Sequence, residues 1–157
     1  MAPIFLAPLQ YASRDLVLLA VSNNPDVQAA GGGSHWSLLA HWRPADAFFH
    51  FDSMAGCNAT AVRRLYDILR TPSSQLEEVE TPQQRNDYEC GLVSLAIAQL
   101  LARRYVERGQ CMQFSLQRSD YNPDALQQLM CNVIDSYAAA EAAEQQMIGV
   151  AAGSKPA

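Results

Sequence analysis

Residues 35–52 of this chain read HWSLLAHWRPADAFFHFD, and this stretch decides the fold. Two runs heavy in aromatic residues, 35–42 and 47–52, are typical of β-strands. Between them lies Arg43-Pro44-Ala45-Asp46, a segment of turn-forming residues. The pattern therefore predicts a hairpin of two antiparallel strands.

The expected register of this hairpin brings an imidazole to a carboxylate. If Trp42 pairs with Ala47, Ser37 faces Asp52, and His35 lies on the same face as Ser37 because side chains alternate along a strand. His35 and Asp52 are then diagonal neighbours within side-chain reach. A carboxylate in that place fixes the tautomer of the imidazole and stabilises its charged form. The alternative is that His35 is an ordinary strand residue and Asp52 a turn former.

A helix that begins at a cysteine supplies a candidate nucleophile. Residues 90–105 are apolar nearly all round, which predicts a buried central helix. Cys90 opens it, where unpaired N–H groups and the helix dipole favour a thiolate, the nucleophile in acyl transfer. Gln84 lies in the polar loop before it, so its amide is a candidate donor to the oxyanion of a tetrahedral intermediate. The simpler alternative is that Cys90 is a small core residue.

The remaining pattern predicts an α+β domain. Residues 15–21 form an apolar run typical of a strand buried on both faces, and 76–80 resembles a short edge strand. Asn58 is a candidate cap for a helix whose apolar face holds Val62, Leu65, Tyr66 and Leu69. A last helix begins at Asn122-Pro123, with one apolar stripe. That stripe comprises Leu126, Leu129, Met130, Val133, Ile134 and Tyr137. We therefore expect an antiparallel sheet packed on the buried helix, in a single domain over 1–137, and a fraying, Ala-rich, disordered tail over 138–157.

Composition excludes several classes of function. The chain has 157 residues and is 49% hydrophobic and 17% charged, which suits a globular domain with a real core. Its net charge of −5 argues against nucleic-acid binding. We expect no membrane span, no metal site, no cofactor and no signal peptide, and hence free thiols in the cytoplasm or nucleus. The chain is assumed to be a monomer. No role is assigned to Cys57, Cys111 or Cys131.

Three short sequence motifs resemble those of the Ulp/sentrin-specific cysteine protease family. Residues 32–39, GGSHWSLL, resemble that family's catalytic-His strand, and residues 48–53, FFHFDS, its catalytic-Asp strand. Residues 83–91, QQRNDYECG, resemble its nucleophile motif. The resemblance runs from about residue 4 to about residue 105. It is closest to the deneddylase branch, through the loop that precedes His35 and the Tyr-acidic pair before Cys90.

The resemblance implies a papain-like fold and a thiol protease with His35, Asp52, Gln84 and Cys90 as its catalytic set. It also implies hydrolysis after the Gly-Gly tail of a Nedd-type ubiquitin-like modifier, by precursor processing or by release from conjugated proteins. Trp36 would then form one wall of a narrow tunnel for the glycine tail. We expect Asn24, Gly32 and Gly33 in the preceding loop to contact the modifier, although turn formation is the simpler account of that loop.

The family resemblance further implies an N-terminal segment with a second tunnel tryptophan, and we expect this part of the fold to be missing here. Two alternatives stay open. The chain is a SUMO-specific protease with the same catalytic set, or an inactive, shortened relative that binds a modifier.

Overall fold

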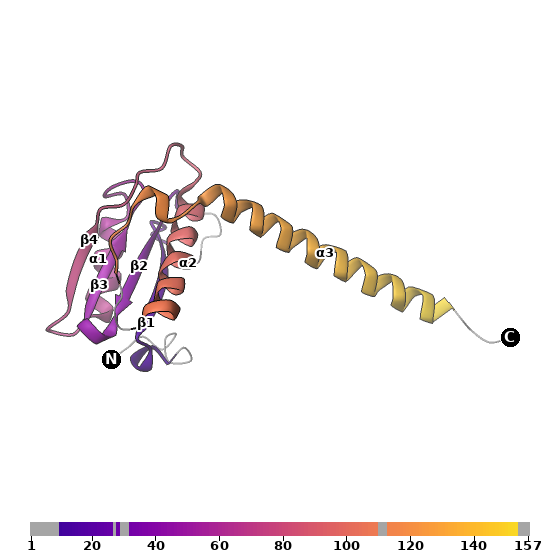
Figure 1. Cartoon of the computed structure of the whole chain (residues 1–157), viewed down its shortest axis with the longest axis horizontal. Helices are drawn as coiled ribbons and strands as arrows, with labels where there is room; N and C mark the ends of the chain where they lie inside the picture. Colours follow the sequence, from indigo (N-terminus) through magenta and orange to yellow (C-terminus); the bar gives the residue numbers. More distant parts are fainter. Residues whose placement is uncertain (1–9, 27, 29–31, 110–112, 154–157) are drawn as a thin grey trace. The chain divides into compact units, whose positions relative to one another are not determined.

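The computed structural model describes residues 10–26, 28, 32–109 and 113–153 (Figure 1). The chain divides into two compact units, Met1–Pro123 and Asp124–Ala157. Cys111 lies outside the described residues, and the cysteines within them (Cys57, Cys90 and Cys131) are free thiols.

The first unit is built on one mixed sheet. Its strands are β1 (Leu16–Ser22), β2 (Trp36–Trp42), β3 (Ala47–Phe51) and β4 (Gln75–Val79), in the spatial order β1-β2-β3-β4. Strands β1 to β3 pair antiparallel, as expected, which confirms the α+β class. The expectation of an antiparallel sheet is wrong for β4, which pairs parallel with β3. Helix α1 (Ala59–Leu69) connects those two strands, and a helical crossover returns the chain in the same direction.

The predicted hairpin register is confirmed. Trp42 pairs with Ala47, and a short 3₁₀ helix, η3 (Arg43–Ala45), makes the turn. Asp46 follows in the left-handed region, with φ of 49°. Its carboxylate accepts hydrogen bonds from the hydroxyls of Thr71, Ser73 and Ser74, of 2.6–2.7 Å, and these bonds lower its pKa to about 2. The hairpin turn is thereby tied to the loop that leads into β4.

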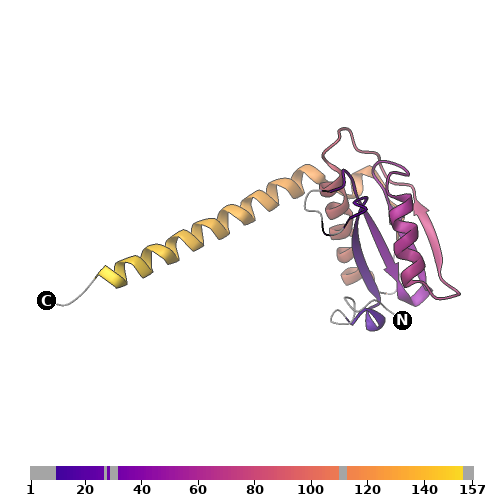
Figure 2. The same ribbon diagram turned by 180° about the vertical axis from the view of Figure 1, so that it is seen from behind.

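Each face of the sheet is covered by one helix, as the opposite views in Figures 1 and 2 show. Alternate side chains of the strands point to opposite faces, and so two separate apolar clusters form. The cluster under α1 comprises Tyr11, Val21, Leu39, Phe48, Val62, Tyr66 and Leu69. The cluster under α2 (Cys90–Arg108) comprises Leu38, Ala40, Trp42, Phe51, Val93, Ile97, Leu101 and Phe114.

Two burial predictions are wrong, and both concern the same side of the unit. Of the residues of β1, Val21 is buried and the others are half-buried or exposed, because β1 is an edge strand. Helix α2 is buried along one face, whereas Leu95 is 48% exposed and Val106 is 83% exposed. Within the described residues, then, the sheet covers α2 on one side only.

A buried histidine on the α1 side of the sheet adds a polar contact to the apolar cluster. His41 stacks on Phe48, with ring centroids 4.1 Å apart, and its Nδ1 lies 2.7 Å from the Tyr11 hydroxyl. Burial lowers the pKa of His41, while nearby Asp46 partly opposes that shift. Burial also raises the pKa of Tyr11 to about 12. His41 is therefore held as the neutral imidazole.

The second unit consists of helix α3 (Pro123–Gly153), whose start at Pro123 is as predicted. The expected apolar stripe is present; Leu126 is half-buried, and the later members are exposed, namely Leu129, Met130, Val133, Ile134 and Tyr137. Helix continues to Gly153, through most of the range where a fraying helix and a disordered tail were expected, and the boundary at 137 stays a prediction. No helix among the described residues is long and apolar enough to cross a membrane.

Candidate active site

Hydrogen bonds to Asn23 place His35 at the start of β2. The side-chain oxygen of Asn23 accepts the main-chain N–H groups of Ser34 (2.8 Å) and His35 (3.1 Å). The Asn23 N–H in turn donates to the His35 carbonyl at 3.2 Å. These three bonds fix the backbone of His35 where β1 ends and β2 begins.

His35 and Asp52 form a buried pair, as their predicted diagonal position requires. His35 Nε2 lies 2.6 Å from Asp52 Oδ1, and the two residues are 2% and 6% exposed. The same oxygen accepts the Met54 N–H at 3.0 Å, and Oδ2 accepts the Asn58 N–H at 3.1 Å. Because an ionised carboxylate only accepts hydrogen bonds, Nε2 carries the proton of the neutral imidazole. The turn-forming role of Asp52 is therefore combined with orientation of His35.

The other ring nitrogen of His35 is the basic one. Nδ1 is buried and has no hydrogen-bond partner among the described residues. A neutral imidazole that donates through Nε2 keeps a lone pair on Nδ1. A buried polar atom without a partner is uncommon in native proteins, and a catalytic role is one of the explanations for such an atom.

Cys90 is the first residue of α2 and is 5% exposed. One turn later, the Ser94 hydroxyl donates to the Trp36 carbonyl at 3.3 Å, which fixes the start of α2 against the strand residue next to His35. The loop before the helix is held by Asn86, whose side-chain oxygen accepts the N–H groups of Tyr88 and Glu89. The thiol thus lies at the positive end of a 19-residue helix.

Gln84 is held in the loop before Cys90 by three hydrogen bonds. Its main-chain N–H donates to the Ser53 carbonyl (2.9 Å), and its side-chain oxygen accepts the Ser53 hydroxyl (2.7 Å). One N–H of its amide donates to the Asn86 carbonyl at 2.6 Å. The second N–H of this primary amide is the one that would donate to an oxyanion. That role of Gln84 stays a prediction.

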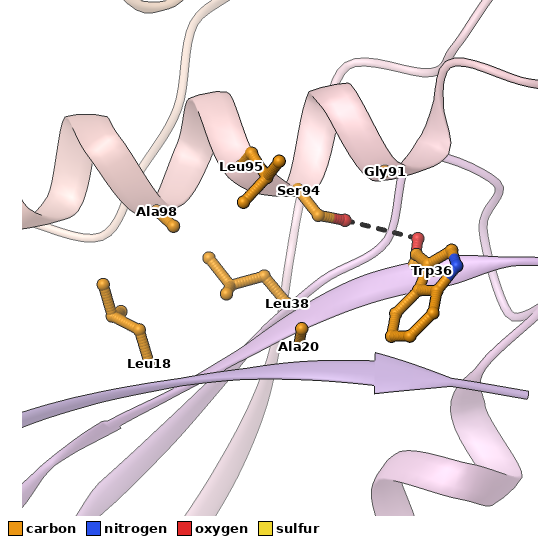
Figure 3. Close-up of a pocket in the computed structure, with 8 residues that line it drawn as sticks. All are labelled: Leu18, Ala20, Trp36, Leu38, Gly91, Ser94, Leu95 and Ala98. Carbon is orange, nitrogen blue, oxygen red and sulfur yellow. Dashed lines mark hydrogen bonds between the residues drawn. The ribbon is translucent and has the colours of Figure 1, made fainter. Parts of the chain in front are cut away.

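An apolar groove lies beside Trp36, between α2 and the β1–β2 edge (Figure 3). Its volume is about 350 Å³, and the indole of Trp36 is 47% exposed. Gly91, the residue after Cys90, also lines it. The remaining lining residues are Leu18, Ala20, Leu38, Ser94, Leu95 and Ala98. The structure therefore places the predicted substrate-binding tryptophan and the start of α2 on one surface.

The glycines before His35 are explained by packing within their own loop. A Cβ on Gly32 would lie 2.5 Å from the Asn24 side-chain oxygen. Gly33 has φ of +92°, and a Cβ there would lie 2.8 Å from Ser22 Oγ and 2.9 Å from the Asn24 nitrogen. The Asn24 oxygen accepts the Asp26 N–H, which makes a local turn. Contact of Asn24, Gly32 and Gly33 with a modifier stays a prediction.

Sequence reasoning missed three residues that hold the site together. Asn23, Ser53 and Asn58 contact His35, Gln84 and Asp52 respectively. Asn58 was expected to cap α1, but it makes no side-chain cap bond. Among the described residues, no group of three or more His, Cys, Asp or Glu side chains is placed to hold a metal ion.

Comparison with known proteins now identifies the family. Residues 27–132 match the model of the Ulp1 protease family, C-terminal catalytic domain, a range that contains His35, Asp52, Gln84 and Cys90. The chain belongs to the Ulp1 protease family. Among curated relatives in sequence, NEDD8-specific protease 1 of Arabidopsis thaliana is 36% identical over 110 residues, covering 67% of this chain and 49% of the relative. Sentrin-specific protease 8 of Homo sapiens is 31% identical over 108 residues, covering 65% and 50%.

The chain spans about half the length of these curated Ulp1-family relatives. Among solved structures, the SUMO protease Ulp1 with its catalytic cysteine oxidised to a sulfonic acid aligns with a TM-score of 0.46 at 15% identity. That alignment covers 73% of this chain and 53% of the solved one. The family resemblance inferred from the three sequence motifs is thus confirmed by the family match.

Proposed function

We propose that this chain carries the catalytic set of a thiol protease that cleaves after the C-terminal Gly-Gly of a Nedd-type ubiquitin-like modifier. The observation that carries the proposal is the buried His35–Asp52 pair with its unpartnered Nδ1. Membership of the Ulp1 family and relatives named as NEDD8-specific proteases support it.

In the proposed reaction, His35 Nδ1 takes the proton of the Cys90 thiol. The thiolate then attacks the carbonyl carbon of the last glycine, and the electron pair of the C=O bond moves onto the oxygen. The Gln84 amide and the main chain at Cys90 donate to that oxyanion. Collapse breaks the C–N bond, and the imidazolium of His35 returns its proton to the leaving amine.

The thioester left on Cys90 is hydrolysed by the same groups. His35 Nδ1 takes a proton from the attacking water, and the C–S bond breaks with the electron pair going to the Cys90 sulfur. The imidazolium returns its proton to that thiolate, and the released carboxylic acid of the modifier loses its proton to solvent. Asp52 holds the imidazole in one orientation throughout and stabilises its charged form. No cofactor enters either half of this reaction.

Selection for glycine follows from the surface around Trp36 in this proposal. In the proposal, the half-exposed indole beside the start of α2 lies against the glycine tail, where a larger side chain on the substrate would clash with it. The proposed substrates are a modifier precursor with residues beyond Gly-Gly, and conjugates of the modifier with lysines of other proteins.

The test uses modifiers whose terminal glycine carries a thiol-trapping electrophile. Nedd-type and SUMO-type probes are incubated with the wild type, with Cys90→Ala and with Cys57→Ala, which removes an exposed thiol. We expect the Nedd-type probe to label the wild type and Cys57→Ala, and not Cys90→Ala.

Other labelling patterns contradict the proposal in distinct ways. Labelling by the SUMO-type probe alone would mean that the chain is a SUMO-specific protease. If neither probe labels a protein that circular dichroism shows to be folded, the chain is an inactive relative, with or without the ability to bind a modifier.

A further inference from the structure

The outer oxygen of the Asp52 carboxylate is held by a residue at the start of α1. Oδ2 accepts the main-chain N–H of Asn58 at 3.1 Å, while Oδ1 faces His35. Asn58 also accepts the first helical hydrogen bond of α1, from the Val62 N–H at 2.9 Å. The direction of the Asp52 carboxylate therefore depends on where the first turn of α1 is fixed.

The side chain of Asn58 fixes that turn against the sheet. Asn58 is 0% exposed, and its amide nitrogen donates to the Val21 carbonyl at 2.8 Å and to the Ser37 hydroxyl oxygen at 2.9 Å. Because a carbonyl only accepts, the contact with Val21 defines which end of the amide carries the hydrogens. The Asn58 side chain thus links the first turn of α1 to β1 and β2, next to Asp52.

The polar chain continues across the sheet to the surface. Ser37 Oγ lies 3.0 Å from His50 Nε2, and His50 Nδ1 lies 2.6 Å from Glu78 Oε2. His50 is 0% exposed, whereas the Glu78 side chain is 61% exposed. The carboxylate of Glu78 accepts the Nδ1–H of His50, so Nε2 accepts the Ser37 hydroxyl, which is left free to accept from Asn58. Each group therefore defines the direction of the next bond.

We propose that Asn58 is a positioning residue for the reaction, and that Ser37 and His50 hold it in place. If the Asn58 amide loses its anchor, the first turn of α1 shifts and Oδ2 loses its N–H donor. The carboxylate then keeps only the contacts of Oδ1 with the Met54 N–H and His35 Nε2, and its direction toward His35 is less firmly fixed. This inference rests on the proposed thiol-protease function, and it extends that function to residues that touch neither Cys90 nor His35.

The alternative role for Asn58 is support of the fold without an effect on Asp52. Two measurements separate the roles. The first is the single-turnover rate on a Nedd-type modifier with a C-terminal fluorophore, and the second is the proton resonance of His35 Nε2–H. A short bond to a carboxylate moves that resonance far downfield, and it is read without any substrate.

For Asn58→Ala we expect kcat to fall by about 10-fold to 100-fold with KM within about twofold, and the downfield resonance to be lost. The same change in an Asp52→Asn background is expected to alter the rate by less than about twofold, because Asn58 acts through Asp52. Thr81→Val is the control, since it removes a different buried side-chain donor, the hydroxyl that donates to the Val79 carbonyl. It is expected to keep both the rate and the resonance.

Ser37→Ala is the second variant, for use where Asn58→Ala does not fold. It removes the hydroxyl between Asn58 and His50, and it should weaken the resonance and lower kcat in the same direction. The proposal is overturned if either folded variant keeps the resonance, or if Asn58→Ala lowers the rate equally in the wild-type and Asp52→Asn backgrounds. Because the resonance needs no modifier, this arm still decides the role of Asn58 where neither modifier probe labels the protein.

Discussion

The bond between Ser53 and Gln84 allows the oxyanion role of Gln84 to be separated from its structural role. Two variants break the same hydrogen bond. Gln84→Ala removes the acceptor of the Ser53 hydroxyl, the bond from its amide to the Asn86 carbonyl, and the N–H that would donate to the oxyanion. Ser53→Ala removes the hydroxyl and keeps the amide. Both keep the main-chain bond from the Gln84 N–H to the Ser53 carbonyl.

Both variants are expected to lose stability, and Gln84→Ala is expected to lose more of it. Ser53 is 3% exposed, so Gln84→Ala leaves a buried hydroxyl without its acceptor, at a cost of about 1–3 kcal/mol. Ser53→Ala loses one buried hydrogen bond, worth about 1 kcal/mol. In a chain of this length each kcal/mol lowers Tm by roughly 2–4 °C. Both variants should therefore unfold a few degrees below the wild type in a thermal melt followed by circular dichroism.

Their rates are expected to differ widely. Loss of one oxyanion donor lowers kcat by about 10²–10³, or roughly 3–4 kcal/mol in the activation free energy. We expect Gln84→Ala to show this loss in single-turnover cleavage of a modifier–fluorophore substrate, and Ser53→Ala to stay within a few-fold of the wild type. If the two variants lose equal rate, Gln84 acts through the loop structure and the oxyanion assignment is refuted.

Three further predictions concern stability. Burial lowers the pKa of His41, so as the pH falls His41 takes up a proton in the unfolded chain before it does so in the folded one. The free energy of unfolding should therefore fall as pH drops below about 6.5. Urea titrations at pH 7.5 and pH 5 should show a smaller fall in this free energy for His41→Phe than for the wild type, and an equal fall would contradict the prediction. Phe48→Ala empties a fully buried site between His41 and Tyr66 and should cost about 3–5 kcal/mol in urea unfolding; a cost under about 1 kcal/mol would show that α1 does not pack as described. Gly33→Ala should destabilise more than Gly56→Ala, since both have positive φ but a Cβ meets close neighbours at Gly33 alone of these two; equal losses of Tm would remove the packing explanation.

The part of the site that depends on local pattern was predictable from the sequence. Alternation along two strands and a short turn fix one register, and that register places His35 diagonal to Asp52. A one-residue slip would exchange the faces of Phe48 and Phe51 and would place His35 and Asp52 on opposite faces of the sheet. The start of α2 at Cys90 was likewise evident, because polar loop residues give way there to an apolar run.

Other features were decided only by tertiary structure. β4 pairs parallel with β3 because of where α1 returns the chain, and the composition of a five-residue strand does not record its direction. The exposed side of α2 depends on which surfaces the sheet covers, whereas periodicity reports only that the helix is apolar.

The polar contacts behind the site show the same limit most clearly. The sequence gives Asn58 the position of a helix cap, yet its amide reaches Val21 and Ser37, 37 and 21 residues away in the chain. Side-chain amides bond equally well to local and to distant groups, and only the packed sheet decides which of these is within reach. The sequence by itself therefore determined which residues carry the proposed chemistry, and the tertiary structure decided which residues hold them in place.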